Sequence, residues 1–182
     1  NKSGPSRYTA KLYSERGSYR IPHTIEQMKD GVIYISFTSF KRVPIMAVIK
    51  ALGLVKDQEI SQSISDSVQY DDVYVNLIDA IANEIKDEDS AIEFLSKKAG
   101  ITLPKEQRFE RTLNDMDKYL LPHLGMTKED RIVKAYNLCK VVKRFLMVAR
   151  EGKRIKDKDH YMNKRLKLSG DLLSELFRMN LR

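Results

Sequence analysis

The chain has 182 residues, of which 42% are hydrophobic and 32% are charged, and this balance predicts a soluble globular domain and argues against a disordered segment. A single cysteine, Cys139, excludes an internal disulfide framework and predicts a buried, inert thiol in a reducing compartment. No apolar run approaches the ~20 residues of a membrane span and no signal peptide is visible, so we expect a cytoplasmic protein without a membrane partner. The chain begins at Asn1 and ends at Arg182 within a predicted helix, so we expect a piece of a longer polypeptide.

The net charge of +8 is concentrated in one part of the chain. Lys140 to Lys167 contains eleven Lys or Arg and three Asp or Glu, which leaves 22 basic and 22 acidic residues elsewhere. A basic stretch gains free energy by displacing counterions from a phosphate backbone. The asymmetry therefore favours a polyanionic neighbour, and the alternative is a solvated face that only aids solubility.

The first forty residues show the period-two alternation of β-strands. Residues 1–6 form a polar lead-in that we expect to be flexible. Strands are predicted at Arg7–Leu12, Thr24–Lys29 and Val32–Phe37. Asp30 and Gly31 between the last two predict a hairpin turn with both residues at positive φ. These segments together predict a small antiparallel sheet.

Helical spacing of apolar residues replaces this alternation in the rest of the chain. The predicted helical segments are Pro44–Gly53, a short helix from Asp57, one from Asp71, Ser90–Gly100, Pro104–Pro122, Thr127–Gly152 and one from Ser169. Ser90 with Glu93, and Thr127 with Asp130, have the spacing of helix caps. The apolar stripes expected to face the core are Val73, Leu77, Ile81 and Ile85; Phe109, Leu113, Met116 and Leu120; and Ile132, Tyr136, Cys139, Val142 and Leu146. The predicted fold class is α+β, a small N-terminal sheet followed by a mostly helical body.

The sequence contains no pattern of catalytic or metal-binding residues. There is no Walker loop, no G-x-G-x-x-G, no cysteine pair and no H-E-x-x-H. Asp157 and Asp159 have D-x-D spacing, but the lysines around them compete with Mg²⁺ for their carboxylates. His23, His123 and His160 lie far apart in sequence without ligand spacing. We therefore expect no catalytic residue and no metal ligand in this chain.

The basic stretch suits sequence-independent contact with phosphates. Its members on the last long helix are Lys140, Lys143, Arg144 and Arg150, and those on the connection after it are Lys153, Arg154, Lys156, Lys158, Lys164, Arg165 and Lys167. An ammonium binds phosphate as a point charge with little directional demand. Only Tyr161 adds an aromatic ring to the connection, which argues against recognition by base stacking.

The connection also carries the most specific motif, the string DKDHYMNKRLKLSG at residues 157–170. It resembles the signature D-D-x-D-H-x-x-N/K-K/R-R-L-x-L-x-G of the second-largest subunits of archaeal and eukaryotic-type multisubunit RNA polymerases. Lys156 replaces the first aspartate, and Met162 stands where a small residue is usual. Residues 43–53, 91–95 and 121–124 resemble further segments of the same subunit in the same order, and the high charge content is typical of an archaeal version.

The resemblance implies the lobe of that subunit running into the start of the fork, with residues 7–152 as the lobe and 153–182 as the basic junction and first fork helix. The parent enzyme is DNA-directed RNA polymerase, a nucleotidyltransferase whose Mg²⁺ is bound by the largest subunit, so no cofactor is expected here. The lobe forms one wall of the downstream DNA cleft. The implied partners are the other polymerase subunits, DNA, the DNA–RNA hybrid and general transcription factors, with a nucleoid-associated location.

The resemblance places the junction nearest the nucleic acid. The residues concerned are Lys153, Arg154, Lys156, Lys158, His160, Asn163, Lys164, Arg165 and Lys167. An alternative role for His160 and Asn163 is to hold the junction together by hydrogen bonds. An alternative function for the chain is a docking module for general transcription factors, since the acidic stretch Asp66 to Asp89 suits a basic partner. An unrelated third hypothesis is a free basic regulator or nucleic-acid-binding protein.

Overall fold

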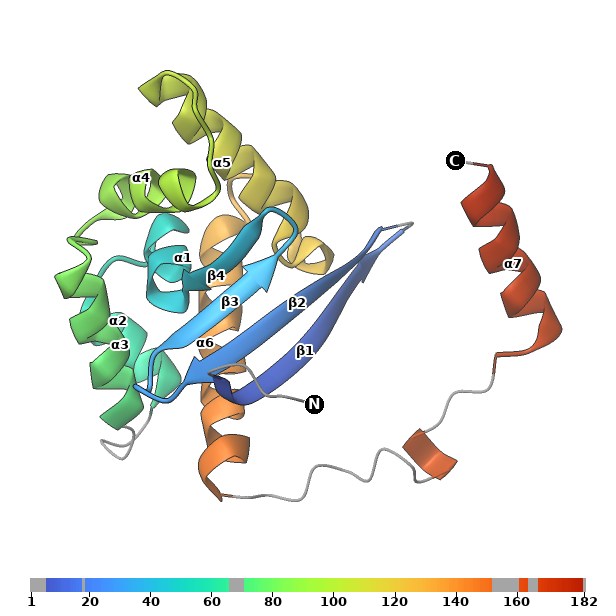
Figure 1. Cartoon of the computed structure of the whole chain (residues 1–182), viewed down its shortest axis with the longest axis horizontal. Helices are drawn as coiled ribbons and strands as arrows, with labels where there is room; N and C mark the ends of the chain where they lie inside the picture. The colour runs from blue at the N-terminus through green and yellow to red at the C-terminus, as the bar shows by residue number, and fades with distance from the viewer. Residues whose placement is uncertain (1–5, 18, 66–70, 152–160, 164–166, 182) are drawn as a thin grey trace. The chain divides into compact units, whose positions relative to one another are not determined.

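The computed structural model describes residues 6–17, 19–65, 71–151, 161–163 and 167–181 (Figure 1). Internal contacts divide the chain into two units, Asn1–Leu146 and Met147–Arg182, and each is described by itself. Ser6 begins the first strand, and the rest of the predicted lead-in lies outside the described residues. The boundary predicted between residues 152 and 153 also lies outside them and stays a prediction.

A four-stranded antiparallel sheet in the order β1-β2-β3-β4 opens the first unit, which confirms the predicted N-terminal sheet. Its strands are β1 (Ser6–Arg16), β2 (Tyr19–Met28), β3 (Ile33–Phe37) and β4 (Phe40–Pro44). The first two form a long hairpin that extends past β3, because β3 pairs only with residues 23–27 of β2. The sequence analysis missed β4, whose exposed Lys41 and Arg42 break the apolar alternation.

The turn between β2 and β3 differs from the predicted one. Gly31 has a φ of +91°, but Asp30 keeps a negative φ and instead accepts a hydrogen bond from the backbone N–H of Val32 through its side chain (3.0 Å). Asn76 reaches this turn from a later helix: its Oδ1 accepts from the Ile33 N–H (2.7 Å), and its Nδ2 donates to the Gly31 carbonyl (3.1 Å). The turn is therefore closed by side chains as well as by its backbone.

Helices follow the sheet, as predicted for the α+β class. Those described are α1 (Ile45–Ala51), α2 (Asp57–Ile64), α3 (Asp71–Ala82), α4 (Glu88–Lys98), α5 (Lys105–Tyr119), η1 (Pro122–Leu124), α6 (Arg131–Glu151), η2 (Tyr161–Asn163) and α7 (Ser169–Asn180). Three predicted starts are corrected, one of them that of α6, which begins at Arg131 and not at Thr127. Pro44 is the N-cap of α1. Helix α4 begins one turn earlier than predicted, because Asp87 is its N-cap and Ser90 its N3 partner.

The core lies between the sheet and the helices of the first unit. Residues of β2, β3 and β4 join the wholly buried helix α1 and the inner faces of α3, α4 and α6 in one hydrophobic cluster. Helix α6 runs behind the sheet in the view of Figure 1. Within this core Lys50 of α1 is buried, and its ammonium donates to the Ile85 carbonyl (3.2 Å) and pairs with Asp57 (2.8 Å). A buried cation of this kind keeps its charge only with such partners.

The predicted stripe of α3 is only partly correct. Val73 and Leu77 are buried as expected, and so is Ile85 after the end of the helix, but Ile81 is exposed. Ala80 takes its place in the core. The helix ends at Ala82, and the chain then turns through Glu84 at φ +59° so that Ile85 points inward.

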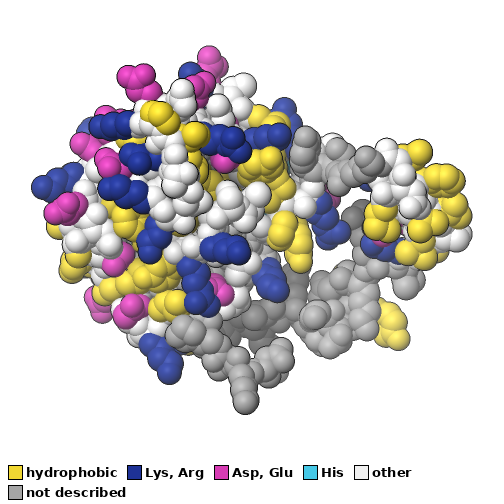
Figure 2. All heavy atoms as spheres, turned by 45° about the horizontal axis from the view of Figure 1, so that its top comes forward, with side chains coloured by type: hydrophobic (Ala, Val, Ile, Leu, Met, Phe, Trp, Pro, Cys, Tyr) yellow, Lys and Arg dark blue, Asp and Glu magenta, His cyan; other side chains and the backbone are white. Residues whose placement is uncertain are grey.

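The second unit carries α7, the predicted last helix. None of its side chains is buried, and those of Leu172, Leu173, Leu176 and Phe177 are all more than half exposed. Figure 2 shows hydrophobic side chains over much of this helix, at the right of the view. Among the residues that the structure describes, no helix combines the length and apolar character that crossing a membrane requires.

Candidate nucleic-acid interface

Helix α6 carries the described part of the basic stretch. Its inner face, with Leu138, Cys139 and Val142, is buried in the core. Lys140 and Arg144 are exposed, and they lie one turn apart along the outer face. Cys139 is buried as predicted, and burial raises the pKa of its thiol to about 12, which favours the unreactive thiol form. Because the opposite side of α6 is buried in the core, Lys140 and Arg144 are held on the exposed side of the helix.

Tyr136 adds an aromatic ring to this outer face, and the sequence analysis missed it. It was assigned with Ile132 to the buried stripe, but both are about 40% exposed. Lys134 and Ala135 take the buried positions instead. Tyr136 stands one turn before Lys140, so Tyr136, Lys140 and Arg144 form a line that we call the α6 outer line. The sequence did contain a signal for the correct buried side of α6. It is an equally regular apolar stripe made of Ala135, Leu138, Cys139, Val142 and Leu146.

The structure describes few of the other residues predicted to face nucleic acid. Lys143 is half buried and Arg150 is exposed on α6. Asn163 ends η2, and Lys167 is exposed and pairs with Glu175 of α7. The remaining predicted residues lie outside the described ones: Lys153, Arg154, Lys156, Lys158, His160, Lys164 and Arg165. The structure therefore neither brings these residues together nor separates them.

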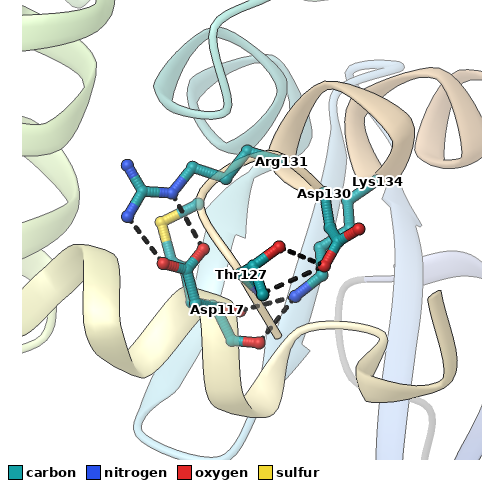
Figure 3. Close-up of polar contacts among 6 residues, drawn as sticks. Asp117, Thr127, Asp130, Arg131 and Lys134 are labelled. Atoms are coloured by element: carbon teal, nitrogen blue, oxygen red, sulfur yellow. Dashed lines mark hydrogen bonds and ion pairs between the residues drawn. The ribbon is translucent and has the colours of Figure 1, made fainter. Parts of the chain in front are cut away.

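A buried ion pair holds the start of α6 against the end of α5 (Figure 3). The guanidinium of Arg131 donates through Nε and Nη2 to the two carboxylate oxygens of Asp117, at 2.8 and 2.6 Å. The side chains are 13% and 9% exposed. Fork-to-fork geometry of this kind fixes the relative orientation of two elements as well as their distance. The direction of the α6 outer line therefore depends on this pair.

Lys134 and Asp130 complete the anchor. The Lys134 ammonium donates to the carbonyls of Met116 (3.4 Å) and Asp117 (2.6 Å) in the last turn of α5, where carbonyls begin to run out of helical partners. Burial lowers its pKa to about 8, against the opposite effect of the nearby Asp117 and Asp130 carboxylates. Asp130 accepts from the N–H and hydroxyl of Thr127 (3.0 and 2.6 Å), but both residues precede α6, which begins at Arg131, so the helix start predicted at Thr127 is wrong.

The segment after α5 is held by the β1–β2 hairpin. Ser14 lies 2.6 Å from the Nδ1 of His123, and Arg16 donates to the Pro122 carbonyl at 3.2 Å. His23 accepts from the N–H of Leu121 at 3.2 Å. Leu121 has a φ of +46°, which is unfavourable for leucine and is held by these contacts. The α5–α6 connection is thus tied to the sheet on one side and to α6 on the other.

Acid is expected to destabilise the chain through His23. Its Nδ1 donates to the Ile21 carbonyl (3.1 Å) and its Nε2 accepts from Leu121, so the ring is neutral in the fold. Burial lowers its pKa below 6.5, so the unfolded chain binds this proton more readily. The stability contributed by neutral His23 is complete above pH ~6.5 and is lost as the pH falls through the lowered pKa. The free energy of unfolding, measured by urea titration between pH 7 and 5, should decline.

His23→Gln should show a flatter decline over this range than the unchanged chain. Equal slopes for His23→Gln and the unchanged chain would contradict a buried neutral imidazole.

The arrangement supports binding by charge. Within the described ranges, no group of three or more His, Cys, Asp or Glu side chains is placed to hold a metal ion. Basic, acidic and hydrophobic side chains are interspersed over the face of the first unit shown in Figure 2. The α6 outer line can contact phosphates through Lys140 and Arg144, and Tyr136 can pack on a sugar or base.

Comparison with known families matches residues 2–167 to the model described as RNA polymerase Rpb2, domain 2. This match covers most of the chain, including the sheet, the helical body and most of the DKDHYMNKRLKLSG string.

Curated archaeal proteins are similar over nearly the whole chain. The chain is 37% identical over 174 residues to the DNA-directed RNA polymerase subunit Rpo2 of Saccharolobus solfataricus, covering 94% of the chain and 15% of that protein. It is 36% identical over 180 residues to subunit Rpo2N of Methanocaldococcus jannaschii, covering 97% and 36%. It is 35% identical over 183 residues to Rpo2N of Halobacterium salinarum, covering 98% and 35%. The chain thus spans roughly a seventh to a third of the length of these relatives.

Proposed function

The chain belongs to the RNA polymerase Rpb2 domain 2 family, in the second-largest polymerase subunit, and on this premise we propose that it forms the lobe that walls the downstream DNA cleft. In this role it contacts the nucleic-acid backbone during transcription and takes no part in bond making. The nucleotidyltransferase reaction and its Mg²⁺ belong to other parts of the polymerase. Other polymerase subunits, DNA and the DNA–RNA hybrid are its proposed partners.

The α6 outer line is the observation that carries the proposal. Lys140 and Arg144 are exposed on a helix that is anchored by the Asp117–Arg131 pair. In sequence this helix leads directly into residues 153–167, which hold seven Lys or Arg and two Asp. An anchored helix α6 followed by the cations of residues 153–167 fits a surface that contacts the phosphate backbone independently of nucleotide sequence.

Neutralisation of the basic stretch in a reconstituted polymerase tests the proposal. We expect replacement of Lys153, Arg154, Lys156, Lys158, Lys164, Arg165 and Lys167 by glutamine to weaken promoter opening several-fold, because fewer phosphates are neutralised. The loss should grow with salt concentration. Nucleotide addition on a preformed bubble should survive, since no reacting group is removed.

Lys140→Gln with Arg144→Gln should also weaken promoter opening, because it removes the two cations of the α6 outer line. Its matched control is Lys86→Gln with Lys98→Gln, which removes two exposed charges near the two ends of α4 and should leave opening unchanged. Promoter opening equal to that of the unchanged enzyme in all variants would contradict the proposal and leave the stretch as a solvated face. Loss of opening and addition together would point instead to a defect in assembly.

A further inference from the structure

Helix α3 has apolar side chains on its outer face as well as its inner face. Val73 and Leu77 are buried in the core. The outer residues are Tyr74, Ile78 and Ile81, with exposed fractions of 47%, 64% and 56%. Their spacing of i, i+4 and i+7 lines them up over about two turns, roughly 10 Å. A helix on the surface of a domain normally turns polar residues to water, and among the residues that the structure describes none covers this outer row.

The surroundings of this row are acidic although the chain as a whole is basic. Residues 57–85 contain seven Asp or Glu and no Lys or Arg, in a chain whose net charge is +8. Helices α2 and α3 come from this stretch and pack against each other, but Asp57 and Glu59 of α2 pair with Lys50 and Lys56, so the negative charge near the row comes from α3 and its ends. Asp71 and Glu84 are exposed at the two ends of the row. The result is an apolar row with negative charge at both ends.

We propose that the outer face of α3 is a docking surface for an amphipathic helix of another protein that presents apolar residues flanked by lysines or arginines. The apolar row gains from burial against a second apolar row, and a straight two-turn ridge fits the groove of a packed helix. The acidic ends attract basic side chains and steer their approach. The same charge repels nucleic acid and anionic lipid, which leaves a basic protein helix as the occupant.

The surface is small, and this limits the strength of the contact. Three half-exposed side chains form a short row, well below the area of a stable protein interface, so binding should be weak and reversible. The proposal concerns a different helix from the α6 outer line. Failure of either proposal leaves the other unchanged.

A synthetic peptide tests the surface directly. The probe is a fluorescent helical peptide of leucine and lysine with its leucines on one face, titrated against the 182-residue chain by fluorescence anisotropy. Ile78→Gln with Ile81→Gln should weaken binding about tenfold or more, because these two side chains supply most of the exposed apolar area. Asp71→Asn with Glu84→Gln should weaken binding and reduce its dependence on salt. Val133→Gln, which removes an exposed apolar side chain of α6, should change nothing.

Several results would overturn the proposal once circular dichroism has shown that each variant is folded. One is equal binding to the chain with both isoleucines replaced. Another is equal binding of a peptide with the same composition but scrambled order. Self-association of the chain that depends on Ile78 would make a second copy the occupant. If the peptide bound only to the variant with Leu173→Gln and Phe177→Gln, the apolar side chains of α7 would be the occupant of the surface.

Discussion

Replacing Asp117 by alanine is expected to lower the free energy of unfolding by about 3–5 kcal/mol. The change leaves Arg131, whose side chain is 13% exposed, without the carboxylate that accepts both hydrogen bonds of its guanidinium. Removing one partner of a buried pair leaves a charge that neither water nor protein compensates. Urea unfolding monitored by circular dichroism measures the loss.

Two comparisons separate the effect of burial from the effect of charge. Glu15→Ala breaks the exposed Arg20–Glu15 pair, whose side chains are 60% and 61% exposed, and should cost no more than about 1 kcal/mol. Asp117→Leu combined with Arg131→Met removes both buried charges and should recover most of the loss. A loss for Asp117→Ala no larger than that for Glu15→Ala would show that the pair does not hold α5 and α6 together.

Replacing Gly125 by alanine is expected to lower the free energy of unfolding by about 2–4 kcal/mol, from backbone strain of about 1–3 kcal/mol and weakening of the Thr127–Asp130 hydrogen bonds by about 1 kcal/mol. Gly125 has a φ of +142°, where a side chain is strained, and an added Cβ would lie 2.0 Å from Oδ2 of Asp130. That oxygen accepts both hydrogen bonds from Thr127 at the start of α6. The alanine must therefore displace the carboxylate that binds Thr127 just before α6.

Gly53→Ala is the matched control for Gly125→Ala. Gly53 also has a positive φ, +97°, but nothing lies within 4 Å of an added Cβ. Gly53→Ala should lower the free energy of unfolding by only about 1–2 kcal/mol, which is the strain of an alanine in a left-handed conformation. Thermal or urea unfolding of the two variants gives the comparison. Equal losses would mean that the close approach of Gly125 to Asp130 carries no stability.

The sheet and most helices were predictable because their periodicity follows from one buried face. Val32–Phe37 alternates as β3 does, and the cluster of apolar residues after Pro44 marks the buried helix α1. Helix ends were predicted less well, since several caps use residues one turn away from the ones expected. In α4 the cap is Asp87, three residues before Ser90.

The side of a helix that faces the core was harder to predict where both sides are apolar. Ile81 and Tyr136 were placed in the core by their spacing, but Ala80 and Ala135 lie there instead. A small residue allows close packing, and the larger one beside it is left outside. The stripes that contain Ile81 or Tyr136 and those that contain Ala80 or Ala135 both have helical spacing. Which of them is buried therefore depends on packing in three dimensions.

The candidate interface was partly visible in the sequence. The charge concentration in residues 140–167 and the exposure of Lys140 and Arg144 follow from composition and helical period. The anchor of α6 does not, because Asp117 and Arg131 lie on different helices, and nothing in their local sequence shows that they meet. For α3, the sequence analysis predicted only that the acidic stretch suits a basic partner. It did not predict the apolar row on the outer face of the helix.

The salt dependence of DNA loading by the reconstituted polymerase tests the account most directly. In a plot of log affinity against log salt concentration, Lys140→Gln with Arg144→Gln should reduce the slope by about two units, one for each lost phosphate contact. Lys86→Gln with Lys98→Gln should leave the slope as it is. A slope for the α6 variant equal to that of the unchanged enzyme would contradict the claim that this helix faces the nucleic-acid backbone.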